Sequence, residues 1–118
     1  MTIAPGKWNI TIVQGADFDY TLTLYANRVP IDLTGFTAKM EGRTAYLGLP
    51  APFFTLTTEN GGITLGGVAG TVRLYMSAAT TSLLSLNGVY DLKLISSGGT
   101  TTDRAMQGSV TISPQVTT

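Results

Sequence analysis

The 118-residue sequence contains no cysteine and no histidine, and these two absences remove several kinds of chemistry. Without cysteine the chain has no disulfide bonds, so the fold depends on the packing of its core. Without histidine it lacks the side chain that most often acts as a general base and as a neutral metal ligand. A serine nucleophile normally needs such a base. We therefore expect no cofactor and no metal centre.

Charged residues are also scarce and make up only 12% of the chain. Seven Lys and Arg balance seven Asp and Glu, so the net charge is zero. Nucleic-acid binding through phosphate neutralisation requires a basic stripe, and the sequence has none. No apolar run approaches the roughly 20 residues of a membrane span, and residues 1–7 do not have the pattern of a signal peptide. We expect neither nucleic acid nor a membrane as partner, whereas zero net charge is compatible with permanent assembly.

Threonine and glycine are abundant instead, with 20 and 14 residues. Threonine is β-branched and suits a pleated surface, and glycine supplies the turns between short strands. Apolar and polar residues alternate with period two, most clearly where Phe18, Tyr20, Leu22 and Leu24 share one face. The other segments with this alternation are residues 8–13, 36–41, 54–56, 63–65, 71–76, 90–94 and 106–112.

Turn residues separate these segments at intervals of about ten residues, which is typical of a β-sandwich. Residues 77–84 are the one helical candidate, with Ser77 as its cap. The pattern predicts an all-β fold, an antiparallel β-sandwich of about seven to nine short strands with one short helical turn. We expect a single domain over residues 1–118, with flexible tails at 1–6 and 115–118.

The seven carboxylates do not form a recognisable catalytic or metal-binding set. Asp17 and Asp19 lie on the polar face of a predicted strand, where solvated surface charge is the simplest interpretation. A calcium site would need further oxygen ligands at a suitable spacing, and they are missing. Lys7, Lys39 and Lys93 lie in predicted strands and are expected to point outward rather than to activate a serine. We expect the protein not to be an enzyme.

The aromatic residues divide by strand phase. Trp8, Tyr20 and Tyr90 are in phase with aliphatic neighbours, which predicts positions in the core. The aromatic residues expected at the surface or at an interface are Tyr25, Tyr46 and Tyr75. Aromatic rings also stack on sugars, so binding of a host glycan through Trp8 or the surface tyrosines stays open as an alternative function.

Residues 44–52 contain two prolines and a glycine among several apolar side chains, so they are predicted to form an unusually apolar loop. Such a loop lowers solubility unless something covers it. Two interpretations are open: the loop contacts a neighbouring subunit, or it folds over the open end of its own sandwich. The candidate interaction residues are Tyr46, Leu47, Leu49, Pro50, Pro52 and Phe53.

Five segments carry a resemblance to a known family, and they are Gly15–Leu24, Val29–Ala38, Gly70–Thr81, Gly88–Leu94 and Gly108–Pro114. The most specific pieces are Pro-Ile-Asp-Leu-Thr-Gly at 30–35 and Gly-Val-Tyr-Asp-Leu at 88–92. In order and spacing the pattern resembles small phage and prophage virion proteins, in particular the N-terminal immunoglobulin-like domain of upper baseplate proteins of tailed phages. The resemblance covers roughly residues 8–117 and implies an immunoglobulin-like fold.

The same motif has a local structural interpretation. Asp32 is expected to form an Asx turn with Thr34, and Gly35 permits a tight re-entry into the next strand. In the family such a domain anchors further modules to the particle. This sequence ends at Thr118 without such a module, which favours an adaptor, collar or decoration subunit present in several copies.

These observations together predict a structural protein of a tailed-phage virion. We expect a tail, baseplate or fibre-adaptor subunit, made in the host cytoplasm and located in the particle. Its partners would be other virion structural proteins in a multi-copy homo- or hetero-oligomer. The alternatives are a capsid decoration protein and a carbohydrate-binding module. A minor enzyme such as a glycosidase is a third alternative, but the absence of histidine and the small number of carboxylates weigh against it.

Overall fold

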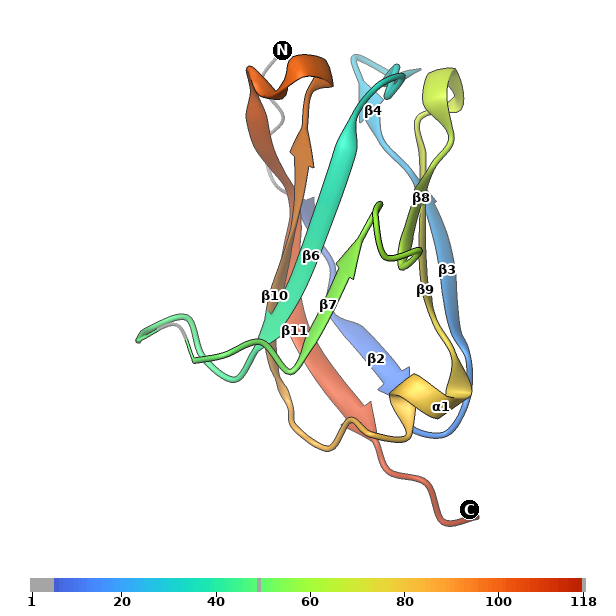
Figure 1. The fold of residues 1–118 in the computed structure, drawn as a ribbon, viewed down its shortest axis with the longest axis vertical. Helices are drawn as coiled ribbons and strands as arrows, with labels where there is room; N and C mark the ends of the chain where they lie inside the picture. Colours follow the sequence, from blue (N-terminus) through green and yellow to red (C-terminus); the bar gives the residue numbers. More distant parts are fainter. Residues whose placement is uncertain (1–5, 49, 118) are drawn as a thin grey trace.

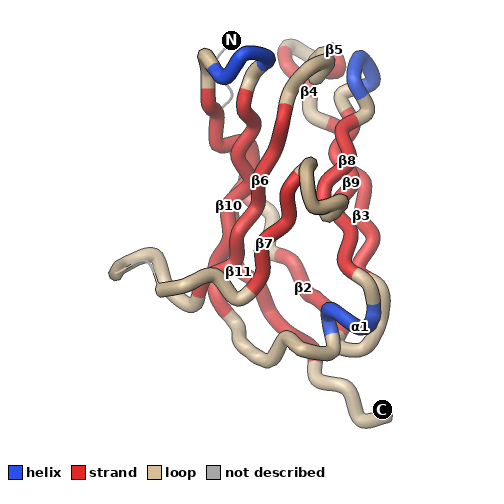
Figure 2. Tube along the Cα trace, viewed as in Figure 1, coloured by secondary structure: helices blue, strands red, loops and turns tan. Residues whose placement is uncertain are grey.

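The strands of the protein pack as two sheets around one apolar core, in a computed structural model that describes residues 6–48 and 50–117 (Figure 1). A two-stranded hairpin lies at one end of this sandwich, and loops and one short helix lie at the other (Figure 2). The predicted all-β sandwich is confirmed. Three of the eleven strands in the described part of the chain have only two residues. The other eight agree with the predicted seven to nine strands.

The larger sheet has six strands in the order β1–β11–β10–β6–β7, with β2 also pairing with β11. Its strands are β1 (Gly6–Lys7), β2 (Ile10–Val13), β6 (Thr37–Arg43), β7 (Phe54–Thr57), β10 (Gly88–Ile95) and β11 (Thr102–Ser113). β6, β7, β10 and β11 pair antiparallel, as predicted. β1 and β2 instead run parallel to β11, so the predicted antiparallel sandwich contains one parallel edge.

The chain passes from β1 to β2 at Trp8 and Asn9 without losing its contact with β11. The Trp8 amide donates to the carbonyl of Gln107 at 2.9 Å, and the Asn9 side chain accepts from the Ser109 amide at 3.1 Å. A Cβ on Gly108 would overlap the Trp8 carbonyl, so only glycine allows this close approach.

The smaller sheet has the order β3–β9–β8, all antiparallel. The elements outside the larger sheet are β3 (Phe18–Thr23), β4 (Tyr25–Ala26), β5 (Val29–Pro30), β8 (Ile63–Leu65), β9 (Thr71–Met76), α1 (Ala78–Thr81) and the 3-10 turns Gly67–Ala69 and Ser97–Gly99. Ser77 caps α1 as predicted, because its hydroxyl accepts from the Thr80 amide at 3.3 Å.

The core follows the alternation of the strands, with the inward residues of β6, β9 and β10 almost fully buried. A bulge interrupts β11, because Leu92 pairs with Met106 while Lys93 pairs with Arg104. The extra residue, Ala105, faces the core.

The predicted turn after β5 is also present. The Asp32 carboxylate accepts from the Thr34 amide at 3.0 Å and from the Thr34 hydroxyl at 2.6 Å. Gly35 follows with a φ of 78°, a value that glycine adopts without strain. Of the predicted flexible tails, residues 1–5 and 118 lie outside the described residues, and Gly6 belongs to β1.

Candidate interaction surface

The loop between β6 and β7 projects from the sandwich. We call residues 44–48 and 50–53 the shelf, because this loop stands out beyond the outer side of the larger sheet (Figure 1). Tyr46 is 62% exposed and Leu47 is 88% exposed, so the tip of the shelf presents apolar surface to solvent. Leu49, also a candidate interaction residue, lies outside the described residues.

The base of the shelf is held firmly by the larger sheet. The Arg43 guanidinium donates to the Pro50 carbonyl at 2.6 Å and to the Glu41 carboxylate at 3.2 Å. The Phe53 amide donates to the Gly42 carbonyl at 2.8 Å, and the Phe53 ring packs partly buried against the core. These contacts fix the direction in which the exposed tip points.

The candidate residues therefore separate into two groups. Tyr46 and Leu47 form the exposed tip, whereas Pro50, Pro52 and Phe53 are half-buried and belong to the base. The alternative in which the loop covers the open end of the sandwich does not fit this arrangement, because the loop projects from the outer side of the larger sheet (Figure 1).

Tyr46 also contributes to two hollows on the outer face of the larger sheet. The first has a volume of about 80 Å³ and includes Arg43, Val89 and Asp91 in its lining. The second has a volume of about 290 Å³ and includes Val89 and Gln107. The shelf and the outer face of the sheet thus form one continuous surface.

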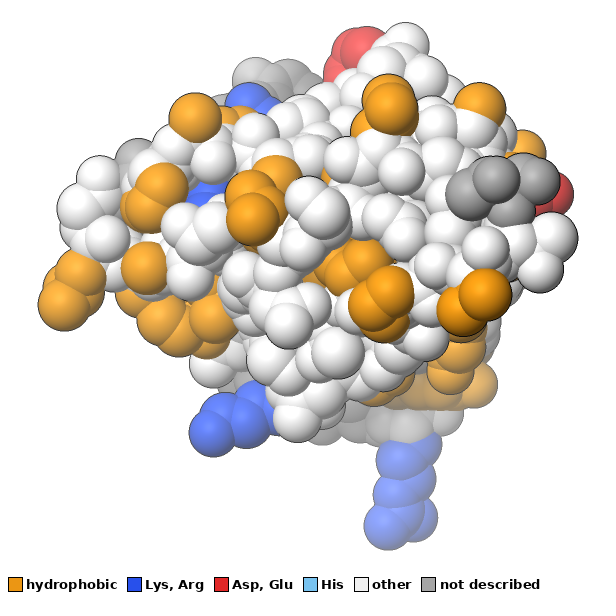
Figure 3. Space-filling model, turned by 90° about the horizontal axis from the view of Figure 1, so that it is seen from below, with side chains coloured by type: hydrophobic (Ala, Val, Ile, Leu, Met, Phe, Trp, Pro, Cys, Tyr) orange, Lys and Arg blue, Asp and Glu red, His pale blue; other side chains and the backbone are white. Residues whose placement is uncertain are grey.

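A second group of exposed apolar side chains lies at the α1 end of the sandwich. Leu83 and Leu86 lie in the segment that joins α1 to β10, and both are exposed. Val13 ends β2 nearby, and hydrophobic groups are scattered over this end and over the shelf (Figure 3). Sequence reasoning did not single out this group. Of the two adjacent leucines Leu83 and Leu84, only Leu84 is buried in the core, so Leu83 is left at the surface.

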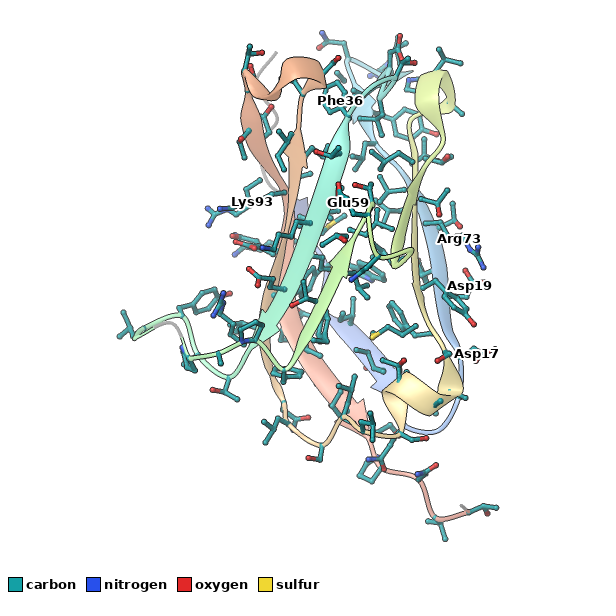
Figure 4. All side chains as sticks on the ribbon, in the orientation of Figure 1. Asp17, Asp19, Phe36, Glu59, Arg73 and Lys93 are labelled. Atoms are coloured by element: carbon teal, nitrogen blue, oxygen red, sulfur yellow. The ribbon has the colours of Figure 1, made fainter. Side chains whose placement is uncertain are left out.

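The exposed carboxylates of the smaller sheet serve structural contacts. Asp19 and Arg73 form a bidentate ion pair, in which Nε and Nη2 of Arg73 donate to the two carboxylate oxygens of Asp19 at 2.9 and 2.8 Å. The pair lies on the side of the molecule opposite Lys93 (Figure 4). The hydrogen bond from Arg73 holds the pKa of the Asp19 carboxyl below its usual value, against the opposing effect of desolvation. Asp17 accepts from the Ala78 amide at 2.7 Å. The prediction that Asp17 and Asp19 are surface charges is confirmed.

No group of three or more acidic residues that could hold a metal ion occurs within residues 6–48 and 50–117. Lys7, Lys39 and Lys93 are exposed, as predicted. In the part of the chain that is described, no helix has the length and apolar character needed to cross a membrane.

The three aromatic residues predicted for the core differ in their positions. Tyr90 is buried, as expected, but Trp8 is half-buried and Tyr20 is 47% exposed. The rings of Trp8 and Tyr20 stack with centroids 4.4 Å apart. Tyr20 lies opposite buried Leu74 and so faces the core side, but β3 is an edge strand and leaves the ring partly open.

A groove of about 300 Å³ lies between β7 and β9 and includes Asn60, Tyr75 and Thr80 in its lining. The Asn60 side chain is already engaged, because it accepts from the amides of Thr57 and Gly62 and donates to the Thr55 carbonyl. Asn60 therefore serves the loop itself rather than offering free hydrogen-bonding groups to a ligand such as a sugar.

No family model matches the sequence, and no curated protein matches it significantly. Solved structures do match. One comes from a photo-crosslinking study of the multimeric cell-adhesive interactions of VGSC beta subunits, with 11% identity and a TM-score of 0.50 over 98% of this chain and 99% of that chain. The fold is immunoglobulin-like. At this level of identity the likeness shows the fold alone, and it agrees with the two-sheet topology.

A second similar structure is the extracellular domain of the voltage-gated sodium channel beta4 subunit, from a study of parallel homodimers in cell–cell adhesion. It has 11% identity and a TM-score of 0.45, over 97% of this chain and 99% of that chain. The immunoglobulin-like sandwich expected from the sequence is confirmed by the first of these two neighbours, with its TM-score of 0.50, and by the topology of the sheets.

Proposed function

We propose that this chain is a structural subunit of a tailed-phage virion that acts through protein–protein contacts and catalyses no reaction. The sequence resemblance to the immunoglobulin-like domain of upper baseplate proteins supports the setting in a tail, baseplate or fibre adaptor. The partners are other virion structural proteins, and the chain is made in the host cytoplasm before it enters the particle.

The shelf carries this proposal. Its tip exposes Tyr46 and Leu47 on a loop whose base is fixed by Arg43. Exposed apolar groups on a rigid projection are costly in solution and gain free energy when a partner buries them. A projecting element of this kind suits insertion between neighbouring subunits.

Quantitative mass spectrometry of purified, nuclease-treated phage particles tests the proposal. We expect the wild-type chain in many copies relative to the portal protein. Replacing Tyr46 and Leu47 together by serine is expected to preserve the fold and abolish incorporation, as is deletion of residues 47–51. Val68 is 74% exposed at the opposite end, and Val68→Ser serves as the matched control that keeps incorporation.

Two results would contradict the proposal. Absence of the wild-type protein from particles, despite its expression in infected cells, rules out a virion subunit. Normal incorporation of the doubly substituted shelf variant rules out the shelf as the contact surface. The copy number also separates a tail subunit from the alternative of a capsid decoration protein.

A carbohydrate-binding module is the alternative from another class of function. The Trp8 ring is half-buried and packs against the Tyr20 ring at a tilt of 38°, so only part of its surface is open to a sugar. The surface tyrosines remain, and a glycan array with Tyr25→Ala, Tyr46→Ala and Tyr75→Ala variants distinguishes the two functions. Binding of the wild type that is lost in one of these variants would favour the glycan function.

A further inference from the structure

The outer face of the larger sheet carries its charges in rows that cross the strands. In the register of β6, β10 and β11, Lys39 lies opposite Lys93, and Lys93 lies opposite Arg104. All three residues are exposed, and Lys93 points away from the core (Figure 4). We call these three residues the cationic row.

The next outward row, two residues further along each strand, has the opposite sign. Glu41 lies opposite Asp91, and these two residues form the anionic row. Like charges directly opposite one another on neighbouring strands destabilise a sheet. The two rows therefore cost folding free energy in the isolated chain.

Contacts within the chain compensate this arrangement only in part. Glu41 approaches Lys39 at 3.9 Å and Arg43 at 3.2 Å. Asp91 and Lys93 form no ion pair with any other residue that the structure describes. An open hollow of about 260 Å³ on this face is lined by Lys39, Glu41, Arg43, Asp91 and Lys93. Asp91 and Lys93 are thus charges of opposite sign, in adjacent rows, that have no ion-pair partner among the described residues.

This arrangement is self-complementary under one rotation. A second copy turned end for end lays its β10 antiparallel over the first β10, with the two-fold axis level with Leu92. Because Leu92 lies between the rows, Lys93 then faces Asp91 of the second copy, and Lys39 faces Glu41 of the second copy. Arg104 faces Gln107, an uncharged hydrogen-bond acceptor, so two of the three cations meet an anion. Each contact occurs twice, as a two-fold interface requires.

The opposite orientation is unfavourable for two independent reasons. With the strands of the two copies parallel, each cationic row would face a cationic row. The two shelves, which stand out from this same face, would also meet at one end (Figure 1). In the end-for-end arrangement the two shelves lie at opposite ends and do not meet.

We propose that the outer face of β6, β10 and β11 binds a second copy of this chain in a two-fold, end-for-end dimer. This inference concerns the strand face beside the shelf and does not depend on the virion setting. The face is small, because it consists of three strands about 4.8 Å apart with about eight residues of about 3.3 Å each. We therefore expect a weak dimer. Salt should weaken it further, because its contacts are between exposed charges.

Sedimentation velocity with the full chain tests the dimer. We expect concentration-dependent dimerisation at about 0.01 M salt that is lost at about 1 M salt. Two variants each reverse one side of the proposed ion pairs: Glu41→Lys with Asp91→Lys, and Lys39→Glu with Lys93→Glu. Each alone is expected to raise the dissociation constant at least about tenfold, and an equimolar mixture is expected to restore dimerisation.

A matched control exchanges the ion pair of the other sheet, as Asp19→Arg with Arg73→Asp, and is expected to dimerise like the wild type. A wild type that stays monomeric at every concentration overturns the proposal. So does a mixture of the two reversed variants that dimerises no better than either alone. Circular dichroism of each variant confirms that the sandwich has formed.

Carbodiimide cross-linking of mixed ¹⁴N- and ¹⁵N-labelled chains tests the orientation. We expect mixed-label peptides that join Lys93 to Asp91 and Lys39 to Glu41. Mixed-label cross-links that involve only Asp17 or Asp19, on the side of the smaller sheet, would overturn the proposed face.

Discussion

The hydroxyl of Tyr90 donates a hydrogen bond of 2.5 Å to the main-chain carbonyl of Trp8, across 82 positions of the sequence. Tyr90 lies in β10, in the middle of the larger sheet, and Trp8 lies at the switch between β1 and β2. The Trp8 ring in turn stacks on Tyr20 of the smaller sheet. One chain of three aromatic side chains thus joins the N-terminal segment to both layers.

Replacing Tyr90 by phenylalanine should destabilise the protein by about 1–2 kcal/mol, because the Trp8 carbonyl loses its partner while the packing of the ring is kept. Urea unfolding followed by tryptophan fluorescence measures this change. Tyr25→Phe removes an exposed hydroxyl and is the matched control, with an expected effect near zero. Equal stability of the two variants would show that the hydrogen bond contributes nothing.

The same residue predicts sensitivity to alkaline conditions. Burial raises the pKa of the Tyr90 hydroxyl well above its usual value. Its contribution to stability is therefore complete below the pKa of an unfolded tyrosine, about 10, and is lost as the pH rises above that value. We expect the free energy of unfolding to fall above pH about 10 more steeply in the wild type than in Tyr90→Phe. Parallel curves would contradict this expectation.

Thr81 fastens α1 to the turn between β2 and β3. Its buried hydroxyl donates to the Ala16 carbonyl at 2.8 Å and accepts from the Gly15 amide at 3.1 Å. Thr81→Val keeps the shape and removes both bonds, so we expect a loss of about 1–2 kcal/mol in unfolding experiments. Thr80→Val on the exposed side of the same helix should cost much less, and a reversed order would contradict this role.

Two glycines with positive φ form a matched pair of sites. Gly61 has a φ of 82° and open space around its Cα, whereas a Cβ on Gly70 would lie 2.9 Å from backbone atoms of Ile31. Gly61→Ala should cost about 1–2 kcal/mol from backbone strain alone. Gly70→Ala should cost about 1–3 kcal/mol more because the backbone cannot yield. Thermal and urea unfolding of both variants measures the difference, and equal costs would contradict it.

The alternation of residues predicted the sandwich and most inward positions correctly, because side chains of a strand alternate between faces whatever its neighbours are. It could not distinguish an edge strand from a central one. Tyr20 therefore has the predicted orientation and yet remains half exposed beside Trp8. The bulge at Ala105 also changes the phase within β11, and a pattern of period two carries no sign of it.

Pairing between distant strands was the second gap. Lys39, Lys93 and Arg104 are far apart in the sequence, and only the pairing register of β6, β10 and β11 places them in one row. The parallel contact of β2 with β11 is equally non-local. For the shelf, composition identified an apolar loop, and Arg43 determines that it projects outward.

The parallel contact of β2 with β11 has a mechanical consequence. Because the two strands run in the same direction, tension on opposite ends of the chain pulls them past each other along their length. The backbone bonds over Ile10–Val13 and Val110–Ser113 are then loaded together in shear rather than opened one at a time. We therefore expect a sandwich built in this way to resist stretching along its 43 Å axis more than one whose end strands would open bond by bond.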